Sequence, residues 1–430
     1  MIGRPFACRP ASVQNAVMSR DNRCVFLHIG LYKTGTTYLQ NLWRANRSEL
    51  ARQGVYFPGG GDGPAQVFAV SDLFGRRPKG GGEDRIEGRW PELTSAVAAT
   101  THPTTLISDE SLSLATVGEA KRAVAGFPDH EVHVVVTVRD LGRVLLSSWQ
   151  QAIKSDETWT WQEFVAGVRD RSRRNQNPGR SFWVRQDLLG ILETWRVAVS
   201  RDRVHVVTVP PSGAPKDLLV ERVGKLVGFD HSQLTEPPPW DNRALSTADA
   251  EVLRRVNVLL DHRLNQRQHG RVVRRILTQE LTRRSEADHP VLSADEHAWA
   301  SAEADRIVEG VIDAGYDVIG DLADLAPAEA GAGRRPDEAT SDEMLDSALR
   351  GLATLAEEHA TMWWEQSQSR PGASEGAGRR PSWRSRTRAA KFAIRRRLMS
   401  MGDRHRLVAW PVNAYVRVRS ARRRRAANRS

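Results

Sequence analysis

CVFLHIGLYKTGTTYLQNLW, residues 24–43, joins an apolar segment to an amphipathic one through a short turn rich in glycine and threonine. Residues 25–29 are apolar enough to form a buried strand, and residues 30–35 form the turn. From Thr36 onward apolar residues recur at helical spacing, at Leu39, Leu42 and Trp43. A turn of this kind aims backbone N–H groups and the positive end of a helix at an anion. The stretch therefore predicts a phosphate-binding loop between a strand and a helix.

The position of the lysine in this loop separates two classes of nucleotide-binding protein. A nucleoside triphosphatase carries G-x-x-x-x-G-K-[ST], with lysine directly after the second glycine. Here Lys33 lies two residues before Gly35, in KTGTT at residues 33–37. This order argues against a triphosphate-binding loop.

A second motif, EVHVVVTVRDLGRVLLSSWQQAI, occupies residues 131–153. An apolar strand at 132–138 leads into Arg139, and the helix after it carries Ser147, eight residues beyond the arginine. Asp140 could also be the metal-binding aspartate that follows a strand in nucleoside triphosphatases, and this is the main alternative interpretation. The position of Lys33 weighs against it.

Taken together and in this order, the two motifs resemble the 5′-phosphosulfate loop and the 3′-phosphate site of the sulfotransferases that use 3′-phosphoadenosine 5′-phosphosulfate (PAPS). The resemblance implies a P-loop-like α/β fold of three layers, with helices on both faces of a central, mostly parallel sheet. It implies PAPS as co-substrate and no metal. Many relatives have proline before the lysine, where this chain has Tyr32.

The resemblance assigns roles to the residues of both motifs. Lys33 would stabilise the charge that develops on the leaving 5′-phosphate, since a cation held there favours the transition state over the ground state. Backbone N–H and hydroxyl donors to the phosphosulfate would come from Thr34, Gly35, Thr36 and Thr37, although these threonines could also simply cap the helix.

Arg139 and Ser147 would bind the 3′-phosphate, because a guanidinium offers a planar, permanently charged fork and a serine adds a hydroxyl. The alternative for Arg139 is a surface ion pair with Asp140 or Glu110.

The acceptor needs a base, and LISDES at residues 106–111 places polar residues at the carboxyl end of a predicted strand. Parallel α/β sheets gather their active sites at such ends. Relatives present histidine or glutamate there, so Glu110 is the first choice as base and Asp109 the second. Either carboxylate could instead be a surface charge of the loop. His28 falls within the strand pattern and is expected to be a packed strand residue.

The acceptor itself is expected to be a hydroxyl or amine compound, with carbohydrates and glycolipids as candidates. Flat aromatic faces suit sugar rings, and four tryptophans follow the second motif, but core packing is the favoured role for each of them: Trp149, Trp159, Trp161 and Trp183.

Strand and helix patterns alternate along most of the chain, which predicts a parallel sheet covered on both faces. Strands are expected at 104–108, 132–138 and 204–209. Helices are expected at 112–125, 161–168, 186–199, 217–227 and 293–314, with another capped by Ser246. The glycine-rich residues 59–82 are expected to form a long loop.

Composition shifts divide the chain into six segments. A disordered leader is expected at 1–22, the sulfotransferase-like domain at 23–326, a linker at 327–337, an amphipathic helix at 338–368, a second linker at 369–382 and a basic tail at 383–430. The chain has two cysteines, no apolar run that could span a membrane and no pattern of a signal peptide, so a cytoplasmic location is expected.

The net charge of +11 is concentrated at one end of the chain. Residues 379–430 hold 18 Lys or Arg and one acidic residue, a net charge of +17, whereas the preceding 378 residues hold 45 basic and 51 acidic residues, a net charge of −6. Apolar and aromatic residues interleave with the arginines of the tail, which favours an anionic membrane surface as its partner, with nucleic acid as the less favoured alternative.

Two other functional classes fit parts of these patterns. One is a P-loop kinase or another nucleotide-dependent enzyme on a related sheet, and the other is a non-catalytic scaffold whose working part is the tail. Tight binding of adenosine 3′,5′-bisphosphate relative to ATP with magnesium would single out the sulfotransferase.

Overall fold

The computed structural model describes residues 23–59, 65–76, 86–238, 244–282, 290–328 and 333–368. The predicted leader at 1–22, the second linker from 369 onward and the basic tail at 383–430 lie outside the described residues.

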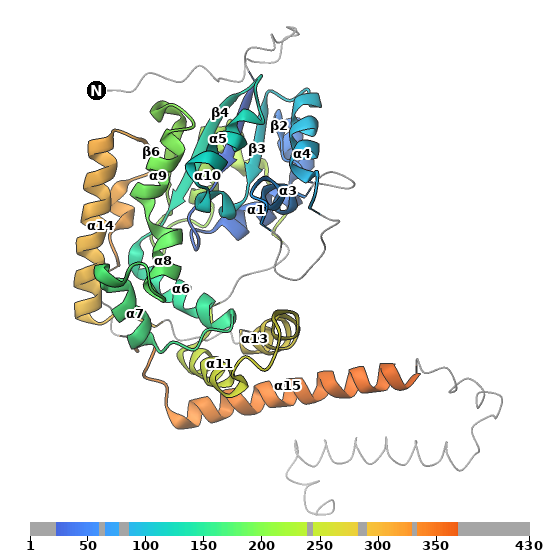
Figure 1. Ribbon diagram of the computed structural model, residues 1–430, viewed down its shortest axis with the longest axis vertical. Helices are drawn as coiled ribbons and strands as arrows, with labels where there is room; N and C mark the ends of the chain where they lie inside the picture. Colours follow the sequence, from blue (N-terminus) through green and yellow to red (C-terminus); the bar gives the residue numbers. More distant parts are fainter. Residues whose placement is uncertain are drawn as a thin grey trace, which may run out of the picture. The chain divides into compact units, whose positions relative to one another are not determined.

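A parallel sheet of six strands in the order β2-β3-β1-β4-β5-β6 forms the centre of the fold (Figure 1). The strands are β1 (Cys24–His28), β2 (Val55–Tyr56), β3 (Thr104–Ser108), β4 (Glu131–Val138), β5 (Val204–Thr208) and β6 (Asp317–Ile319). The first of these is flanked by β3 and β4, so the two motifs of the sequence and the segment with Glu110 all leave the sheet at its carboxyl edge. The predicted α/β fold with a parallel sheet is confirmed.

Helices cover both faces of this sheet. Alternate residues of each strand point to opposite sides, and apolar residues on both sides pack against helices. Cys24 and Phe26 of β1 pack in a cluster with α1 (Thr36–Ala45), α2 (Arg47–Arg52) and α10 (Leu218–Val227). Val25 and Leu27 pack in the cluster of the other face. The helices of that cluster are α3 (Gln66–Leu73), α4 (Arg89–Ala99), α5 (Val117–Ala125), α9 (Leu188–Arg196) and α14 (Ala294–Ala314).

A third apolar cluster is built mainly from helices, and none of its described residues lies in a strand. Its main elements are α6 (Leu141–Lys154), α7 (Trp161–Arg169), α8 (Gly179–Gln186), α11 (Thr247–Leu260), the π-helical turn Gly270–Leu277 and α13 (Thr278–Leu281). Short α12 (Gln266–His269) precedes the π-helical turn. Trp149, Trp161 and Trp183 are buried in this cluster and Trp159 packs against it, which confirms their expected role in the core.

Several predicted element boundaries were wrong, and local capping or packing explains two of them. The glycine-rich segment 59–82 contains α3, whose Ala69 and Val70 are buried against the sheet. The helix expected at 112–125 is a 3₁₀ helix (Glu110–Leu114) followed by α5, because Thr116 and Glu119 form a capping box that begins a new helix. The helix expected at 186–199 is the shorter α9, and α8, which ends at Gln186, and β6 were not predicted.

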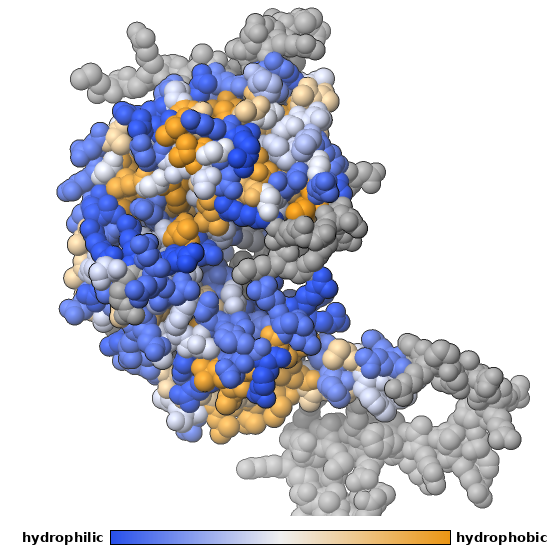
Figure 2. All heavy atoms as spheres, in the orientation of Figure 1, coloured by the Kyte–Doolittle hydropathy of each residue, from blue (hydrophilic) through white to orange (hydrophobic). Residues whose placement is uncertain are grey.

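The amphipathic helix expected at 338–368 is α15 (Ser341–Gln368). The chain divides into two compact units after Leu355, so the division falls within this helix. In the first unit, Ser347 and Arg350 donate hydrogen bonds to the carboxylate of Asp249 in α11, which also accepts one from the hydroxyl of Ser246, the N-cap residue of that helix. Figure 2 shows apolar side chains on the surface over the first half of α15, where the exposed large apolar residues are Leu345, Leu349 and Leu352.

Candidate functional site

The loop between β1 and α1 has a backbone shape that only a few residue types adopt readily. Gly35, which precedes the first turn of α1, has φ 86°, and Lys33 has φ 70°. A left-handed conformation is unfavourable for a lysine by about 1 kcal/mol, and such residues concentrate at ligand-binding sites. The side chain of Lys33 crosses to α6, where its Nζ donates to Oε1 of Gln151 at 2.6 Å.

The threonines of the loop have different surroundings. Thr34 is fully buried, and its hydroxyl donates to the carbonyl of Leu31 at 2.6 Å and lies 2.7 Å from the hydroxyl of Thr137. Thr36 is buried and is the first residue of α1 after its N-cap Gly35, so it does not cap the helix. Thr37 is exposed. The backbone of Thr34 and the hydroxyl of Thr37 are therefore the groups of these two residues that can reach a ligand.

Two side chains brace the loop from α8. The amide of Gln186 donates to the carbonyl of Tyr32 at 2.8 Å, and the guanidinium of Arg185 lies 5.3 Å from the centre of the Tyr32 ring. Tyr32 therefore occupies the usual proline position as a residue held by both its backbone and its ring.

Arg139 leaves the end of β4 and lies across the loop. Its Nη1 donates to the carbonyl of Lys33 at 3.3 Å, its Nε is 4.0 Å from the carboxylate of Asp140, and Nε has no hydrogen-bond partner among the described residues. Burial, together with the nearby Arg143, lowers the pKa of Arg139 to about 10, although Asp140 opposes this shift. At 4.0 Å the ion pair with Asp140 is weak, so the guanidinium of Arg139 remains able to bind an anion.

Asp140 has a structural role. It is buried, its carboxylate caps α6 by accepting from the backbone N–H of Arg143 at 2.9 Å, and it also pairs with the side chain of Arg143. Both oxygens are thereby engaged, which is unfavourable for the metal-binding role considered in the alternative interpretation.

Polar side chains form a row along α6. Ser147, Gln151 and Lys154 are spaced by four and then three residues, which places them on one helix face. The hydroxyl of Ser147 donates to the carbonyl of Arg143 at 2.8 Å, and it must turn away from this bond to reach a phosphate. Sequence reasoning singled out Ser147 but not Gln151 or Lys154, although their polar spacing against apolar Val144 and Leu145 was a usable signal.

Glu110 and Asp109 follow β3 but face different groups. Asp109 is buried and caps the 3₁₀ helix by accepting from the N–H of Ser111 at 2.8 Å, and burial raises its pKa. Burial also raises the pKa of Glu110, and the charge of Lys33 opposes that shift. Asp109 is engaged as a helix cap, whereas the pKa of Glu110 responds to the charge of Lys33, and this favours Glu110 as the base.

His28 is a packed strand residue, as expected. It is fully buried, its Nδ1 lies 2.8 Å from the hydroxyl of Ser108 and its Nε2 lies 3.2 Å from that of Thr137. Burial lowers its pKa to about 3, so the ring is neutral at physiological pH.

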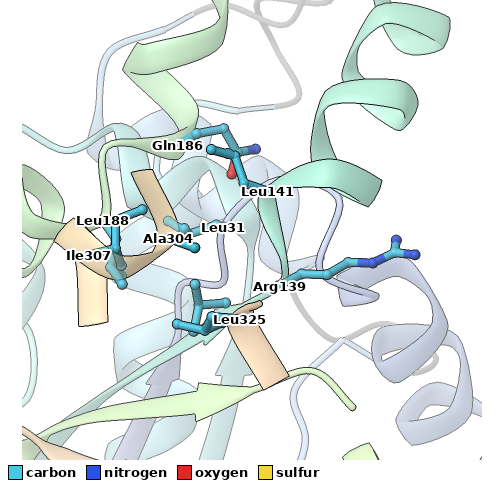
Figure 3. Close-up of a pocket in the computed structure, with 9 residues that line it drawn as sticks. Leu31, Arg139, Leu141, Gln186, Leu188, Ala304, Ile307 and Leu325 are labelled. Atoms are coloured by element: carbon cyan, nitrogen blue, oxygen red, sulfur yellow. The ribbon is translucent and has the colours of Figure 1, made fainter. Parts of the chain in front are cut away.

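A small, mostly apolar cavity lies beside the loop, and Arg139 and Gln186 line it together with apolar side chains. Leu31, Leu141, Leu188, Ile307 and Leu325 are among its lining residues, and Figure 3 shows the guanidinium of Arg139 pointing away from them. An apolar lining does not suit a phosphate.

The site as a whole offers cations at two points and a carboxylate at a third. Lys33 and Arg139 can hold an anion with separated charges, and Glu110 can accept a proton from a molecule bound beside Lys33. Within the part of the chain that the structure describes, no cluster of three or more His, Cys, Asp or Glu could hold a metal ion. Nor is any helix there long and apolar enough to cross a membrane.

No model of a known protein family and no curated protein matches this chain. Among solved structures, it is similar to a sulfotransferase from Alicyclobacillus acidocaldarius. The two share 16% identity with a TM-score of 0.34, over 61% of this chain and 99% of the other.

Proposed function

We propose that this protein transfers a sulfuryl group from PAPS to a hydroxyl or amine acceptor. The observation that carries the proposal is the convergence of three elements on Lys33: its own loop after β1, Arg139 from the end of β4, and Glu110 after β3. These are the groups that sulfuryl transfer needs, namely a cation at the leaving phosphate, a cation for the distal phosphate and a base.

The proposed reaction proceeds in line. An acceptor hydroxyl loses its proton to the Glu110 carboxylate while its oxygen bonds to sulfur. The bond between sulfur and the oxygen of the 5′-phosphate breaks, and adenosine 3′,5′-bisphosphate leaves with the electron pair. By analogy with phosphoryl transfer, the protein mainly positions the groups and stabilises charge. Lys33 would do so at the departing oxygen.

A kinase function has less support in this geometry. A triphosphate loop needs lysine after its last glycine and an aspartate free to hold magnesium. Lys33 precedes Gly35, and Asp140 caps α6 and pairs with Arg143.

Calorimetric titration of the full-length protein tests the proposed function. Adenosine 3′,5′-bisphosphate should bind at least about a hundredfold more tightly than ATP with magnesium, because only the bisphosphate presents anions to both the loop and Arg139. Equal or tighter binding of ATP with magnesium would favour the kinase, and binding of neither nucleotide would favour a scaffold.

Arg139→Ala should weaken binding of adenosine 3′,5′-bisphosphate by about 2 to 4 kcal/mol, because a partly buried guanidinium bound to a phosphate is lost. Adenosine 5′-phosphate, which lacks the 3′ group, serves as the matched ligand, and its affinity should change little. Arg139→Lys, which keeps the charge without the fork, should give an intermediate loss. Equal losses for both nucleotides would contradict the 3′-phosphate role.

We also propose that the protein is cytoplasmic and that its basic tail holds it at the inner membrane surface. Truncation after Gln368 removes the segment of net charge +17, so nucleotide affinity should stay unchanged while sedimentation with anionic vesicles disappears. Vesicle binding by the full-length protein should fall with salt but keep a salt-resistant part, since apolar side chains interleave with the arginines. Failure to bind vesicles, together with steeply salt-dependent binding of RNA or DNA, would assign the tail to nucleic acid.

A further inference from the structure

Lys154 ends α6 one helical turn beyond Gln151, the residue that accepts the hydrogen bond from Lys33. It is half-buried and stands on the same polar helix face as Ser147 and Gln151. Sequence and fold therefore bring a second lysine beside the proposed catalytic lysine.

This second lysine lacks the partner that a half-buried cation normally has. Among the described residues, no carboxylate lies within 4.0 Å of its Nζ. The acid nearest in sequence, Asp156, pairs instead with His262 and His269, at 3.2 and 3.3 Å. Burial and, second, the charge of Lys33 lower the pKa of Lys154 to about 8. An anion bound here would offset two costs, that of burying the charge of Lys154 and that of its repulsion from Lys33.

The charges of the sulfuryl donor are already matched by other groups. In the proposed function, Lys33 and its loop would face the 5′-phosphosulfate, and Arg139 with Ser147 would face the 3′-phosphate. Lys154 lies seven residues beyond Ser147 on α6, which is about 10 Å along the helix axis at about 1.5 Å per residue. Lys154 is thus separated along the helix from the proposed 3′-phosphate site at Ser147, and Gln151, which binds the ammonium of Lys33, lies between the two.

We propose that Lys154 binds an anionic group of the acceptor, so that the acceptor is a hydroxyl or amine compound carrying a carboxylate or sulfate close to the atom that receives the sulfuryl group. The inference rests on the proposed function, because it places the acceptor on the side of Lys33 away from the donor's 3′-phosphate. An ammonium at the end of a helix turn holds such a group by a charge-assisted hydrogen bond.

Competitive acetylation of lysines, read residue by residue by mass spectrometry, tests this in the full-length protein. Labelling is compared without ligand, with adenosine 3′,5′-bisphosphate, with PAPS, and with the bisphosphate plus millimolar glucuronate, glucose 6-sulfate or glucose. Lys121, an exposed lysine of α5, is the internal control. Small anions are used because polyanions would also bind the basic tail.

We expect the bisphosphate to protect Lys33 and to leave Lys154 reactive. Glucuronate or glucose 6-sulfate should then reduce labelling of Lys154 by about threefold or more, because a ligand with a millimolar Kd occupies most of the site at millimolar concentration. Glucose should not reduce it. The proposal is overturned if neither acid protects Lys154, if glucose protects it equally, or if bisphosphate or PAPS alone protects it. Failure of the bisphosphate to protect Lys33 would instead count against the proposed function.

The variant Lys154→Ala separates the two binding roles further. Its affinity for adenosine 3′,5′-bisphosphate should equal that of Lys121→Ala, which removes one exposed positive charge elsewhere. A loss of about tenfold or more relative to that control would place Lys154 in the donor site and overturn the proposal.

Discussion

Lys33→Ala should abolish measurable sulfuryl transfer from PAPS, and this is the largest effect expected. The ammonium is the cation nearest the proposed leaving group, and removing one preorganised group of this kind typically slows the chemical step by about 10² to 10³-fold or more. Transfer is measured with radiolabelled PAPS under single-turnover conditions, so that loss of chemistry is distinguished from slow product release.

Two controls accompany this variant. Lys121→Ala should transfer sulfate at the wild-type rate, and thermal unfolding of Lys33→Ala should match that of wild type, because the lost bond from Lys33 to Gln151 is a single partly exposed contact. Transfer by Lys33→Ala within a fewfold of wild type would remove the loop from the mechanism.

Glu110→Gln should slow the chemical step by about a hundredfold or more while bisphosphate affinity stays near normal, because glutamine keeps size and hydrogen bonding but cannot accept the proton. Asp109→Asn is the matched variant, because asparagine can also cap the 3₁₀ helix. This variant keeps the charge of Glu110. The roles of the two residues must be exchanged if Asp109→Asn is the slow variant and Glu110→Gln is not.

The pH dependence of this pair of groups follows from their burial. Glu110 accepts a proton only when ionised, and burial raises its pKa, so the wild-type rate should rise with pH through that raised value. Lys33 acts only when protonated, and burial lowers its pKa, so the rate should fall again at higher pH. Glu110→Gln should lose the rising limb and keep the falling one. A profile unchanged in shape would exclude Glu110 as the base.

Local patterns in the chain were sufficient to predict the class of the fold and to propose candidate site residues within single motifs. The order of Lys33 and Gly35 argued against a triphosphate loop. The alternation of strands with helices predicted the parallel sheet, because buried strands and amphipathic helices each have their own apolar period. The structure confirms the sheet and brings the loop, Arg139 and the segment with Glu110 to its carboxyl edge.

Sequence alone determined which residue types lie in the loop, after β3 and after β4, and it also located the positive charge in the tail. Only the tertiary structure decided which of them meet. It engaged Asp140 in capping α6 and Asp109 in capping the 3₁₀ helix, and it buried the hydroxyl of Thr34. It also paired Lys33 with Gln151 of α6, the helix that ends at Lys154. The physical reason is that a motif specifies backbone shape over a few residues, whereas the partner of a charged side chain depends on how distant helices pack against the sheet.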